Sequence, residues 1–541
     1  MEVEGGNLSI YKTDVLIVGG GLAGLTAAIS SASNLSETLI VTKTLVGGAN
    51  TTSVAAGIIS GVTAFKYPDD SKELHYRDTI SGGHGVNDAT LVRTMVNDVS
   101  KYLERLKELG LELDGDGEPR RLWIPGHSKP RSYLIKGKSH ALQNLLRRAC
   151  EGLGVKFMER TLITSLVRNN DRVVGAVGIR TDNMEVVGIV ANSTVLATGG
   201  SGELYPYTLM PSGSSGYGVS LGLRAGAELV DMEFVQFYPT MVAEEGLPRL
   251  FVDYAPLLRF GADILDGDGR SIFKKHGIAE PHRLTRDHFS IIMAKEMANG
   301  TALYLDCASI REEDLFSNPL LLSAVKDLES RNVPIRSRRV RVAPYAHFFM
   351  GGLRTDANGA TNVEGLYAAG EAMGGVHGAN RIGGNAFAAC LVFGFRAGLV
   401  ASLYSSTVEE ANGAILKGSA SSLTEAINSK GEVDASHVRE VVQRSMWEGV
   451  GIIRDKSGLE AALRTFNDLR DQRISSKNPA EKLLIPMMLD NAEAIALSAM
   501  IREESRGAHF RRDFPETKEE WRKRIVLKLQ EGECNVSYLM P

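Results

Sequence analysis

Cysteine is scarce in this chain of 541 residues. The four cysteines lie far apart and form no Cys-x-x-Cys pair: Cys150, Cys307, Cys390 and Cys534. Structural zinc sites and iron–sulfur clusters need closely spaced thiolates. We therefore expect four reduced thiols, no metal site, and no iron–sulfur cluster held by this chain itself.

An excess of charge and long apolar runs are also lacking. The 61 basic and 65 acidic residues leave a formal net charge of -4, which gives no electrostatic basis for binding nucleic acid or an anionic membrane surface. The longest uncharged, mainly apolar stretch, residues 382–395, is shorter than the roughly 20 residues that span a bilayer. Residues 1–12 lack the apolar core of a secretion signal. We expect a cytoplasmic protein that reaches a membrane only through partner subunits.

Glycine, in contrast, is abundant. The chain has 57 glycines, about one residue in ten against a usual share of roughly 7%. They gather in clusters such as residues 19–24, 197–202 and 381–385, each beside an apolar run. Glycines placed repeatedly at strand ends indicate a backbone that lies close to a large ligand.

The first glycine cluster predicts a dinucleotide site. Residues 14–18 (DVLIV) and 37–42 (ETLIVT) read as buried strands on either side of a helix of small residues. Between them, Gly19, Gly21 and Gly24 occupy the G-x-G-x-x-G positions that bring a pyrophosphate to a helix N-terminus. An acidic residue for the ribose is missing after the second strand, where Thr42 and Lys43 stand, so NAD is the less favoured dinucleotide.

Four further motifs carry a family resemblance. They are STVLATGG (193–200), APYAHFFMGGL (343–353), EGLYAAGEAMGGVHGANRIGGNAF (364–387) and REESRGAHFRRDFPE (502–516). Their order and spacing resemble those of the flavoproteins of fumarate reductase and succinate dehydrogenase, a family that includes L-aspartate oxidase. The resemblance extends over essentially the whole chain.

The resemblance implies an α/β fold in three parts. A Rossmann-like FAD-binding domain would comprise residues 1–232 and 344–405, interrupted by an α+β capping domain at 233–343. A C-terminal helical domain at 406–515 and a C-terminal tail at 516–541 would follow. Periodic segments after residue 406 are typical of helices.

FAD is the cofactor that the resemblance implies. Glu371 corresponds to a glutamate that hydrogen-bonds the ribityl chain, and Ala386 and Phe387 to residues whose amides contact the isoalloxazine ring. Taken with the fingerprint, the expected cofactor-binding residues are Gly19, Gly20, Gly21, Leu22, Ala23, Gly24, Thr42, Lys43, Thr52, Ser53, Ala55, Gly57, Leu162, Ala197, Thr198, Gly199, Tyr217, Glu371, Ala386 and Phe387.

The resemblance also implies a small carboxylate substrate. Arg381 corresponds to the arginine that binds a substrate carboxylate, and a guanidinium fork suits that ligand. His347 corresponds to a histidine that hydrogen-bonds the same group. Arg259 is assigned the role of the proton-carrying arginine; because arginine is a poor acid by its usual pKa, only the resemblance supports this role.

Two departures from the family pattern modify these expectations. Thr52 occupies the position of the histidine that links FAD covalently in respiratory complexes, so we predict non-covalent FAD, which favours reduction or direct oxygen use over succinate oxidation. Tyr238 replaces a histidine, and Ala255 and Pro256 replace a Thr-Glu pair, at the site for a second carboxylate. Two of these replacements cannot donate a side-chain hydrogen bond, so that half of the site has changed.

The sequence is therefore compatible with three functions. The first is a fumarate reductase or succinate dehydrogenase type of oxidoreductase, with hydride transfer between flavin N5 and a small mono- or dicarboxylate, and with an iron–sulfur protein for its partner. The second is an L-aspartate oxidase, favoured by Thr52 and by the segment GHSKPR (126–131). The third is a flavin-binding paralogue without turnover that serves in assembly or electron transfer.

Overall fold

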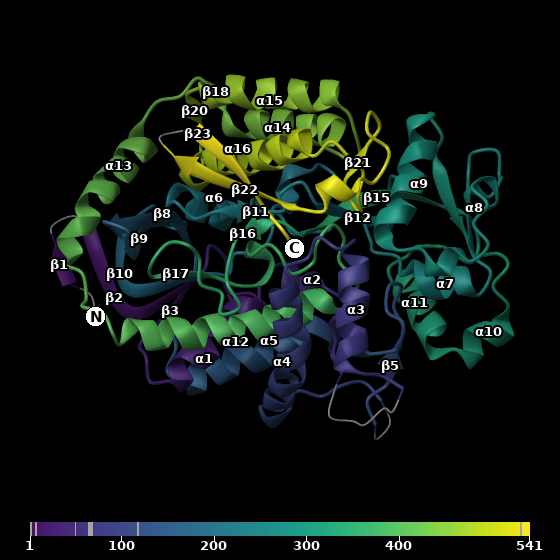
Figure 1. Ribbon diagram of the computed structural model, residues 1–541, viewed down its shortest axis with the longest axis horizontal. Coiled ribbons are helices and arrows are strands. Elements are labelled where there is room, and N and C mark those ends of the chain that lie inside the picture. The colour runs from purple at the N-terminus through teal and green to yellow at the C-terminus, as the bar shows by residue number, and fades with distance from the viewer. Residues whose placement is uncertain (1–2, 6–7, 49, 63–68, 116–117, 531–532) are drawn as a thin grey trace.

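The largest sheet of the computed structural model has eight strands and is parallel at its centre (Figure 1). The structure describes residues 3–5, 8–48, 50–62, 69–115, 118–530 and 533–541. The strand order is β7-β3-β2-β10-β9-β8, with β1 paired to β2 and β17 paired to β10. The strands are β1 (Val3–Gly5), β2 (Leu8–Val18), β3 (Thr38–Val41), β7 (Lys156–Met158), β8 (Thr161–Asn169), β9 (Arg172–Arg180), β10 (Val186–Leu196) and β17 (Leu366–Ala368).

The parallel strands bring several loops to one edge of this sheet. Strands β2, β3, β10 and β17 run parallel, so their carboxyl ends meet where ligands bind in open α/β sheets. Helices α1 (Leu22–Ser33) and α12 (Asn385–Ser405) pack closely against each other below the sheet. A Cβ at Gly398 of α12 would come 2.1 Å from the Ala27 carbonyl of α1, so this contact requires glycine.

Further helices and short strands surround this domain. Helix α4 packs on α12, and α5 packs on α1. These elements are α2 (Thr51–Val54), α3 (Lys72–Gly82), α4 (Ala89–Glu108), α5 (Lys138–Gly152), α6 (Tyr217–Arg224), β4 (Ile58–Ser60), β5 (Arg121–Leu122) and β6 (Ser132–Leu134). The α/β fold class predicted from sequence is confirmed.

A second core forms the cap, at the right of Figure 1. Its sheet has the order β12-β15-β14-β13, and helices cover it. The elements are β12 (Val235–Val242), α7 (Tyr254–Arg259), β13 (Asp263–Leu265), α8 (Ile272–Lys275), α9 (Arg286–Ala298), β14 (Leu303–Asp306), α10 (Glu312–Ser317), α11 (Pro319–Glu329) and β15 (Val340–Phe349). Strands β12 and β15 continue toward the first domain, so residues on them reach both halves.

The C-terminal part is helical and ends in a hairpin. It contains α13 (Lys417–Asn428), α14 (Ala435–Gly449), α15 (Lys456–Arg470), α16 (Pro479–Ile501), β22 (Arg524–Gln530) and β23 (Glu533–Leu539), with the short strands β18 (Val433–Asp434), β19 (Ile453–Arg454), β20 (Ile474–Ser475) and β21 (Phe510–Arg511). Strand β22 pairs with β11 (Leu229–Val230), which also pairs with β16 (Gly352–Leu353), so the predicted tail completes a four-stranded sheet.

Buried charges and core helices fasten this part to the first domain. The buried Arg502 forms ion pairs of 2.7 Å with Glu233 and 2.9 Å with Glu504. The amide of Ala508 donates to the Ala379 carbonyl at 2.9 Å, which fixes the loop before Arg381. Helices α12 and α16 are long and apolar enough to cross a membrane, but both are mostly buried among other helices and are core helices here.

Candidate active site

A cavity of about 800 Å³ lies at the carboxyl ends of the parallel strands, between the first domain and the cap. Its polar and glycine-rich wall comes from the first domain, and residues 249–251, Asp327 and Arg331 come from the cap. Twenty residues predicted from the sequence line it: Gly19, Gly20, Gly21, Leu22, Ala23, Thr42, Lys43, Thr52, Ser53, Ala55, Gly57, Ala197, Thr198, Gly199, Tyr217, His347, Glu371, Arg381, Ala386 and Phe387.

Four predicted residues do not line the cavity. Gly24 lies inside α1, where a Cβ would come 1.9 Å from the Gly19 carbonyl. A glycine at this position lets α1 pack closely against the end of β2. Leu162 is buried in β8. Tyr238 is buried behind the wall, with its ring centroid 5.3 Å from that of His347.

Arg259, the fourth, lies on the surface of the cap. It is the last residue of α7, its side chain is exposed, and its guanidinium carbon lies 6.0 Å from the Phe260 ring centroid. Helix α7 buries its apolar residues Leu257 and Leu258 in the cap core, which turns Arg259 toward solvent. The structure does not bring Arg259 to the cavity.

The dinucleotide end is formed by the turn from β2 into α1. Gly19 has a φ of 118° and would place a Cβ 2.2 Å from the Ala197 carbonyl, so only glycine fits. The first amides of α1 have no carbonyl partner within the helix, and such amides bind phosphate. One of them, Leu22, donates to the Thr52 hydroxyl at 3.1 Å. Thr52 therefore contacts the helix N-terminus.

A buried lysine lies in the same half of the cavity. Lys43 donates to the Gly213 carbonyl, and its Nζ lies 5.1 Å from the Tyr217 ring centroid. Burial lowers the pKa of Lys43 to about 8, partly offset by Glu203. Bound phosphate would favour the charged amine, so Lys43 suits the diphosphate half of the ligand.

Glu371 lies between the two halves. It is buried, and its carboxylate accepts a hydrogen bond of 3.0 Å from the Phe349 amide. Burial raises the pKa of Glu371 to about 7, and the Phe349 amide and Arg381 counteract this. Near neutral pH the group can accept or donate a hydrogen bond, which suits a hydroxyl-bearing chain such as ribityl.

Arg381 is a buried cation that lacks an anion. Its guanidinium donates to Gln236 Oε1 at 2.9 Å and to the Ile382 carbonyl at 3.5 Å, and its Nε has no hydrogen-bond partner in the described part of the chain. Burial and the neighbouring Arg286 hold the pKa of Arg381 well below its usual value. Among the residues that the structure describes, no carboxylate forms an ion pair with it. An anionic ligand would supply this missing partner.

His347 faces the same part of the cavity from β15. Its Nδ1 is buried and has no hydrogen-bond partner within the ranges that the structure describes. Burial, Arg381 and Arg286 hold the pKa of His347 well below its usual value, so the ring is neutral at pH 7. A neutral imidazole beside a guanidinium can donate one further hydrogen bond to a carboxylate.

Gln236 and Arg286 belong to this cluster, and the sequence analysis missed both. Gln236 Oε1 accepts from Arg381 and from Arg286, the latter at 3.4 Å. The Arg286 guanidinium carbon lies 5.1 Å from the Tyr238 ring centroid, and its Nη2 would be 3.1 Å from a Cβ at Gly383. Gln236 could have been found, because it is two residues before Tyr238 and alternate residues share one face of a strand.

The opposite side of this half is aromatic. The ring centroid of Tyr238 lies 4.2 Å from that of Phe251 and 5.7 Å from that of Tyr254. Phe251 and Leu250 line the cavity, and Ala255 is buried beside them. Burial, with a further contribution from Asp253, raises the pKa of Tyr238 well above its usual value, so this phenol is neutral.

Two buried histidines support the loop of Arg381 from behind. His75 Nε2 lies 2.9 Å from Asn385 Oδ1, and His127 Nε2 donates to the Gly383 carbonyl at 3.0 Å. Arg131 donates to His127 Nδ1 at 3.2 Å, which requires a neutral imidazole. The segment 126–131 is therefore part of the support for the glycine loop.

Acid should weaken this support. Burial lowers the pKa of His75 to about 4 and that of His127 to about 3. Both pKa values lie below the pKa of a histidine in the unfolded chain, about 6.5. The two neutral histidines therefore contribute fully to the free energy of unfolding above about pH 6.5, and this contribution is lost as the pH falls toward 4. At pH 5 the expected loss is about 2 kcal/mol per histidine.

We predict that His127→Gln reduces the fall in unfolding free energy between pH 7 and pH 5, because the variant removes one of the two histidines that must be protonated. Urea unfolding at the two pH values measures this fall. An unchanged pH dependence would contradict the prediction.

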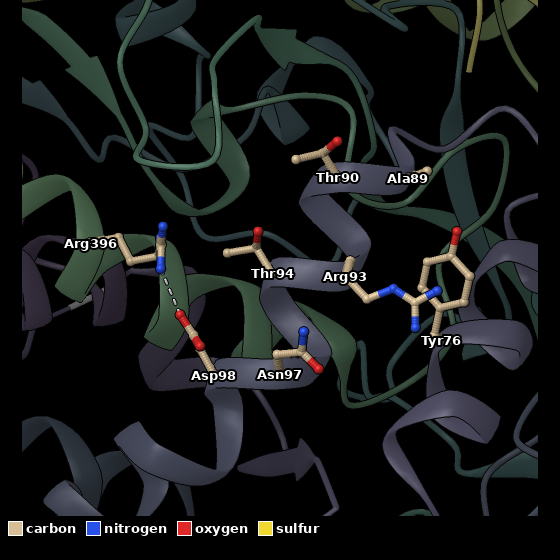
Figure 2. Close-up of a pocket in the computed structure, with 8 residues that line it drawn as sticks. All are labelled: Tyr76, Ala89, Thr90, Arg93, Thr94, Asn97, Asp98 and Arg396. Carbon is tan, nitrogen blue, oxygen red and sulfur yellow. Dashed lines mark hydrogen bonds and ion pairs between the residues drawn. The ribbon is translucent and has the colours of Figure 1, made fainter.

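A second, smaller hollow of about 420 Å³ lies on the outer faces of α4 and α12 (Figure 2). Arg396 pairs with Asp98 at 2.7 Å there, and the Arg93 guanidinium carbon lies 3.6 Å from the Tyr76 ring centroid. These charged groups already have partners, and none of the predicted site residues lies in this hollow.

Comparison with known proteins gives matches along nearly the whole chain. Residues 14–387 match the FAD binding domain family, and residues 439–540 match the fumarate reductase flavoprotein C-terminal family. A fumarate reductase (CoM/CoB) subunit of Methanothermobacter marburgensis is 34% identical, over 96% of this chain and 97% of the relative. An L-aspartate oxidase of Synechocystis is 30% identical, over 95% and 97%. A quinol fumarate reductase structure from E. coli has a TM-score of 0.87 at 26% identity, over 98% of this chain and 97% of that chain.

Proposed function

Because the chain belongs to the fumarate reductase and succinate dehydrogenase flavoprotein family and is a FAD-dependent oxidoreductase, we propose that it transfers a hydride between flavin N5 and a carbon–carbon bond next to a carboxylate. The predicted family and cofactor are confirmed. The observation that carries the proposal is the buried guanidinium of Arg381, which has an unpartnered Nε and no carboxylate partner in the described part of the chain.

Two side chains would bind and orient the substrate carboxylate. Arg381 offers a fork of donors, and Gln236 holds this fork in place by accepting one of its hydrogen bonds at 2.9 Å. His347 offers a second donor from the neighbouring strand. FAD, when bound, supplies or accepts the hydride. The first amides of α12, which begins at Asn385 and presents Ala386 and Phe387 to the cavity, can stabilise negative charge there.

The proton would be carried by Arg286. The resemblance assigns this role to an arginine, and Arg286 lies at the cluster of Gln236 and Arg381 whereas Arg259 is exposed. The carboxylate of Asp287, the next residue, accepts a hydrogen bond of 2.9 Å from His84 Nε2 of the first domain, which fixes the start of α9. The cap residues over the cavity would exclude water from the reacting bond.

We predict that FAD is bound without a covalent link. Thr52 supplies a hydroxyl that already accepts from the Leu22 amide at 3.1 Å, and it has no imidazole with which to form a flavin bond. Acid precipitation of the holoenzyme should leave a colourless pellet and release all flavin into the supernatant, measured by absorbance at 450 nm. A yellow pellet would show that the prediction is wrong.

An iron–sulfur protein is the electron partner that we propose. Relatives of this chain are named as subunits, which supports an assembly of several chains. Two apolar side chains, Val54 and Leu45, are 58% and 44% exposed, and Val54 lies at the cavity rim. Exposed apolar side chains near a redox cofactor suit a docked partner.

One anaerobic experiment tests the proposed function. The holoenzyme is reduced with a viologen dye, and candidate acids are added while the flavin absorbance is followed. Reoxidation by an unsaturated carboxylate supports the proposal. Hydrogen peroxide formed from L-aspartate in air would instead indicate an L-aspartate oxidase, and a holoenzyme that does neither would be a paralogue without turnover.

A further inference from the structure

The cavity half that faces Arg381 is polar at one end and apolar at the other. At the polar end, Arg381 Nε and His347 Nδ1 have no hydrogen-bond partner among the described residues. At the other end, the cap contributes Leu250 and Phe251 to the lining. From this we propose that the preferred substrate is an α,β-unsaturated monocarboxylate with an apolar β-substituent, such as crotonate or a longer 2-enoate. The inference rests on the proposed function, since it names the substrate class of the same site.

The apolar end is backed by a continuous aromatic cluster. Tyr238 packs on Phe251 and on Tyr254, and Tyr254 packs edge-on against Phe289 with ring centroids 5.1 Å apart. Ala255 and Pro256 have no side-chain donor, and the Tyr254 hydroxyl already donates to the Leu284 carbonyl at 2.8 Å. A carboxylate placed here would lose its hydration without gaining equivalent hydrogen bonds.

A protein carboxylate already occupies the neighbourhood of this end. Asp253 has accessible surface, yet burial raises the pKa of its carboxyl while the Arg286 guanidinium lowers it. The effect of the Arg286 guanidinium on this carboxyl places Asp253 near Arg286. A second substrate carboxylate would have to share the charge of Arg286 with Asp253 and would be repelled by it.

Two cap cations line the cavity. Arg331 is exposed and already has an anionic partner, Asp327, at 3.7 Å. The other is Arg249. Its side chain is exposed, and its guanidinium carbon lies 6.0 Å from the ring centroid of Tyr207, which is itself 38% exposed. This places Arg249 at the mouth, where water screens a charge. Arg249 therefore gives a second carboxylate little support compared with the buried Arg381.

The chemistry needs one carboxylate only. The β-carbon of the 2-enoate accepts a hydride, the α-carbon accepts a proton from Arg286, and the double bond becomes a single bond. Charge that develops on the carboxylate oxygens is stabilised by Arg381 and His347. The reduced cofactor is oxidised by two electrons in the same step, and reduced viologen restores them in the assay. An apolar β-substituent then lies against Phe251.

The test compares acids on the viologen-reduced holoenzyme under anaerobic conditions. We expect kcat/KM to be at least tenfold higher for crotonate than for fumarate, and to rise from crotonate to (E)-2-pentenoate as a methylene is added to the apolar end. Butyrate, which lacks the double bond, and 3-butenoate, in which it is not conjugated with the carboxylate, are the matched inactive controls.

Two variants probe the apolar end directly. Phe251→Arg should lower the crotonate to fumarate ratio of kcat/KM at least tenfold, because it places a cation there, whereas Phe251→Leu should keep the wild-type ratio. The monocarboxylate inference is wrong if the wild-type ratio of kcat/KM for crotonate to that for fumarate is one or less. It is also wrong if Phe251→Arg leaves this ratio unchanged. Neither result would contradict the proposed function. If none of the unsaturated acids reoxidises the flavin, the proposed function itself is wrong.

Discussion

Replacing Arg381 with glutamine is expected to lower kcat/KM for the unsaturated acid by about 10³-fold while FAD stays bound. The arginine is 5% exposed, and Gln236 and Ile382 are its only hydrogen-bond acceptors among the described residues. A carboxylate in the cavity would therefore form a buried, charge-assisted pair with it. Removing one partner of such a pair costs about 4 kcal/mol, which corresponds to this factor.

The measurement is steady-state oxidation of reduced viologen, with flavin content determined for each preparation. Arg381→Lys is the matched control, because it keeps the charge and loses the planar fork; its kcat/KM should fall between that of the wild type and that of Arg381→Gln. If Arg381→Gln binds FAD normally and its kcat/KM stays within threefold of the wild type, Arg381 does not bind the carboxylate.

The dinucleotide half of the cavity was predictable from sequence because its determinants are local. The turn between β2 and α1 needs glycine at Gly19, where a Cβ would meet the Ala197 carbonyl, and at Gly24, where helix and strand touch. These requirements leave a fixed spacing in the chain. Thr42 and Lys43 follow directly from the end of β3, so their place at the same edge also follows from strand order.

The substrate half was less predictable because it is assembled from distant segments. Gln236, Arg286 and Arg381 meet although they lie on β12, at the start of α9 and in the loop before α12. Nothing in the sequence near Arg286 marks it as closer to the cavity than Arg259. Only the packing of α7 in the cap core, which turns Arg259 outward, distinguishes the two.

The histidines show the same limit of sequence reasoning. On sequence the segment 126–131 favours an L-aspartate oxidase. In the structure, His127 contacts the Gly383 carbonyl, and Arg131 forms ion pairs with Asp70 and Asp78. Such a supporting segment leaves no recognisable spacing in the sequence, because the residues it contacts are far away in the chain. The carbonyl that His127 contacts, that of Gly383, lies more than 250 residues away.

Arg286→Gln is expected to lower the rate of flavin reoxidation by the unsaturated acid by about 10³-fold at saturating substrate. Positioned proton transfer contributes roughly 10²- to 10⁴-fold to enzymatic rates, and the neutral amide of glutamine is too weak an acid to replace a guanidinium cation. Because Arg381 remains to bind the carboxylate, the loss should appear in kcat more than in KM. Single-turnover stopped-flow reoxidation of the viologen-reduced enzyme measures it directly.

Arg259→Gln is the matched control for this variant, since it makes the same change in the same cap at an exposed position. Its reoxidation rate should stay within twofold of the wild type. The two variants together show which arginine carries the proton. A large loss of rate in Arg259→Gln, with normal turnover in Arg286→Gln, would support Arg259, the residue assigned from the sequence. If both variants lose only substrate affinity and keep kcat, the arginines help to close the cap, and the proton comes from another donor.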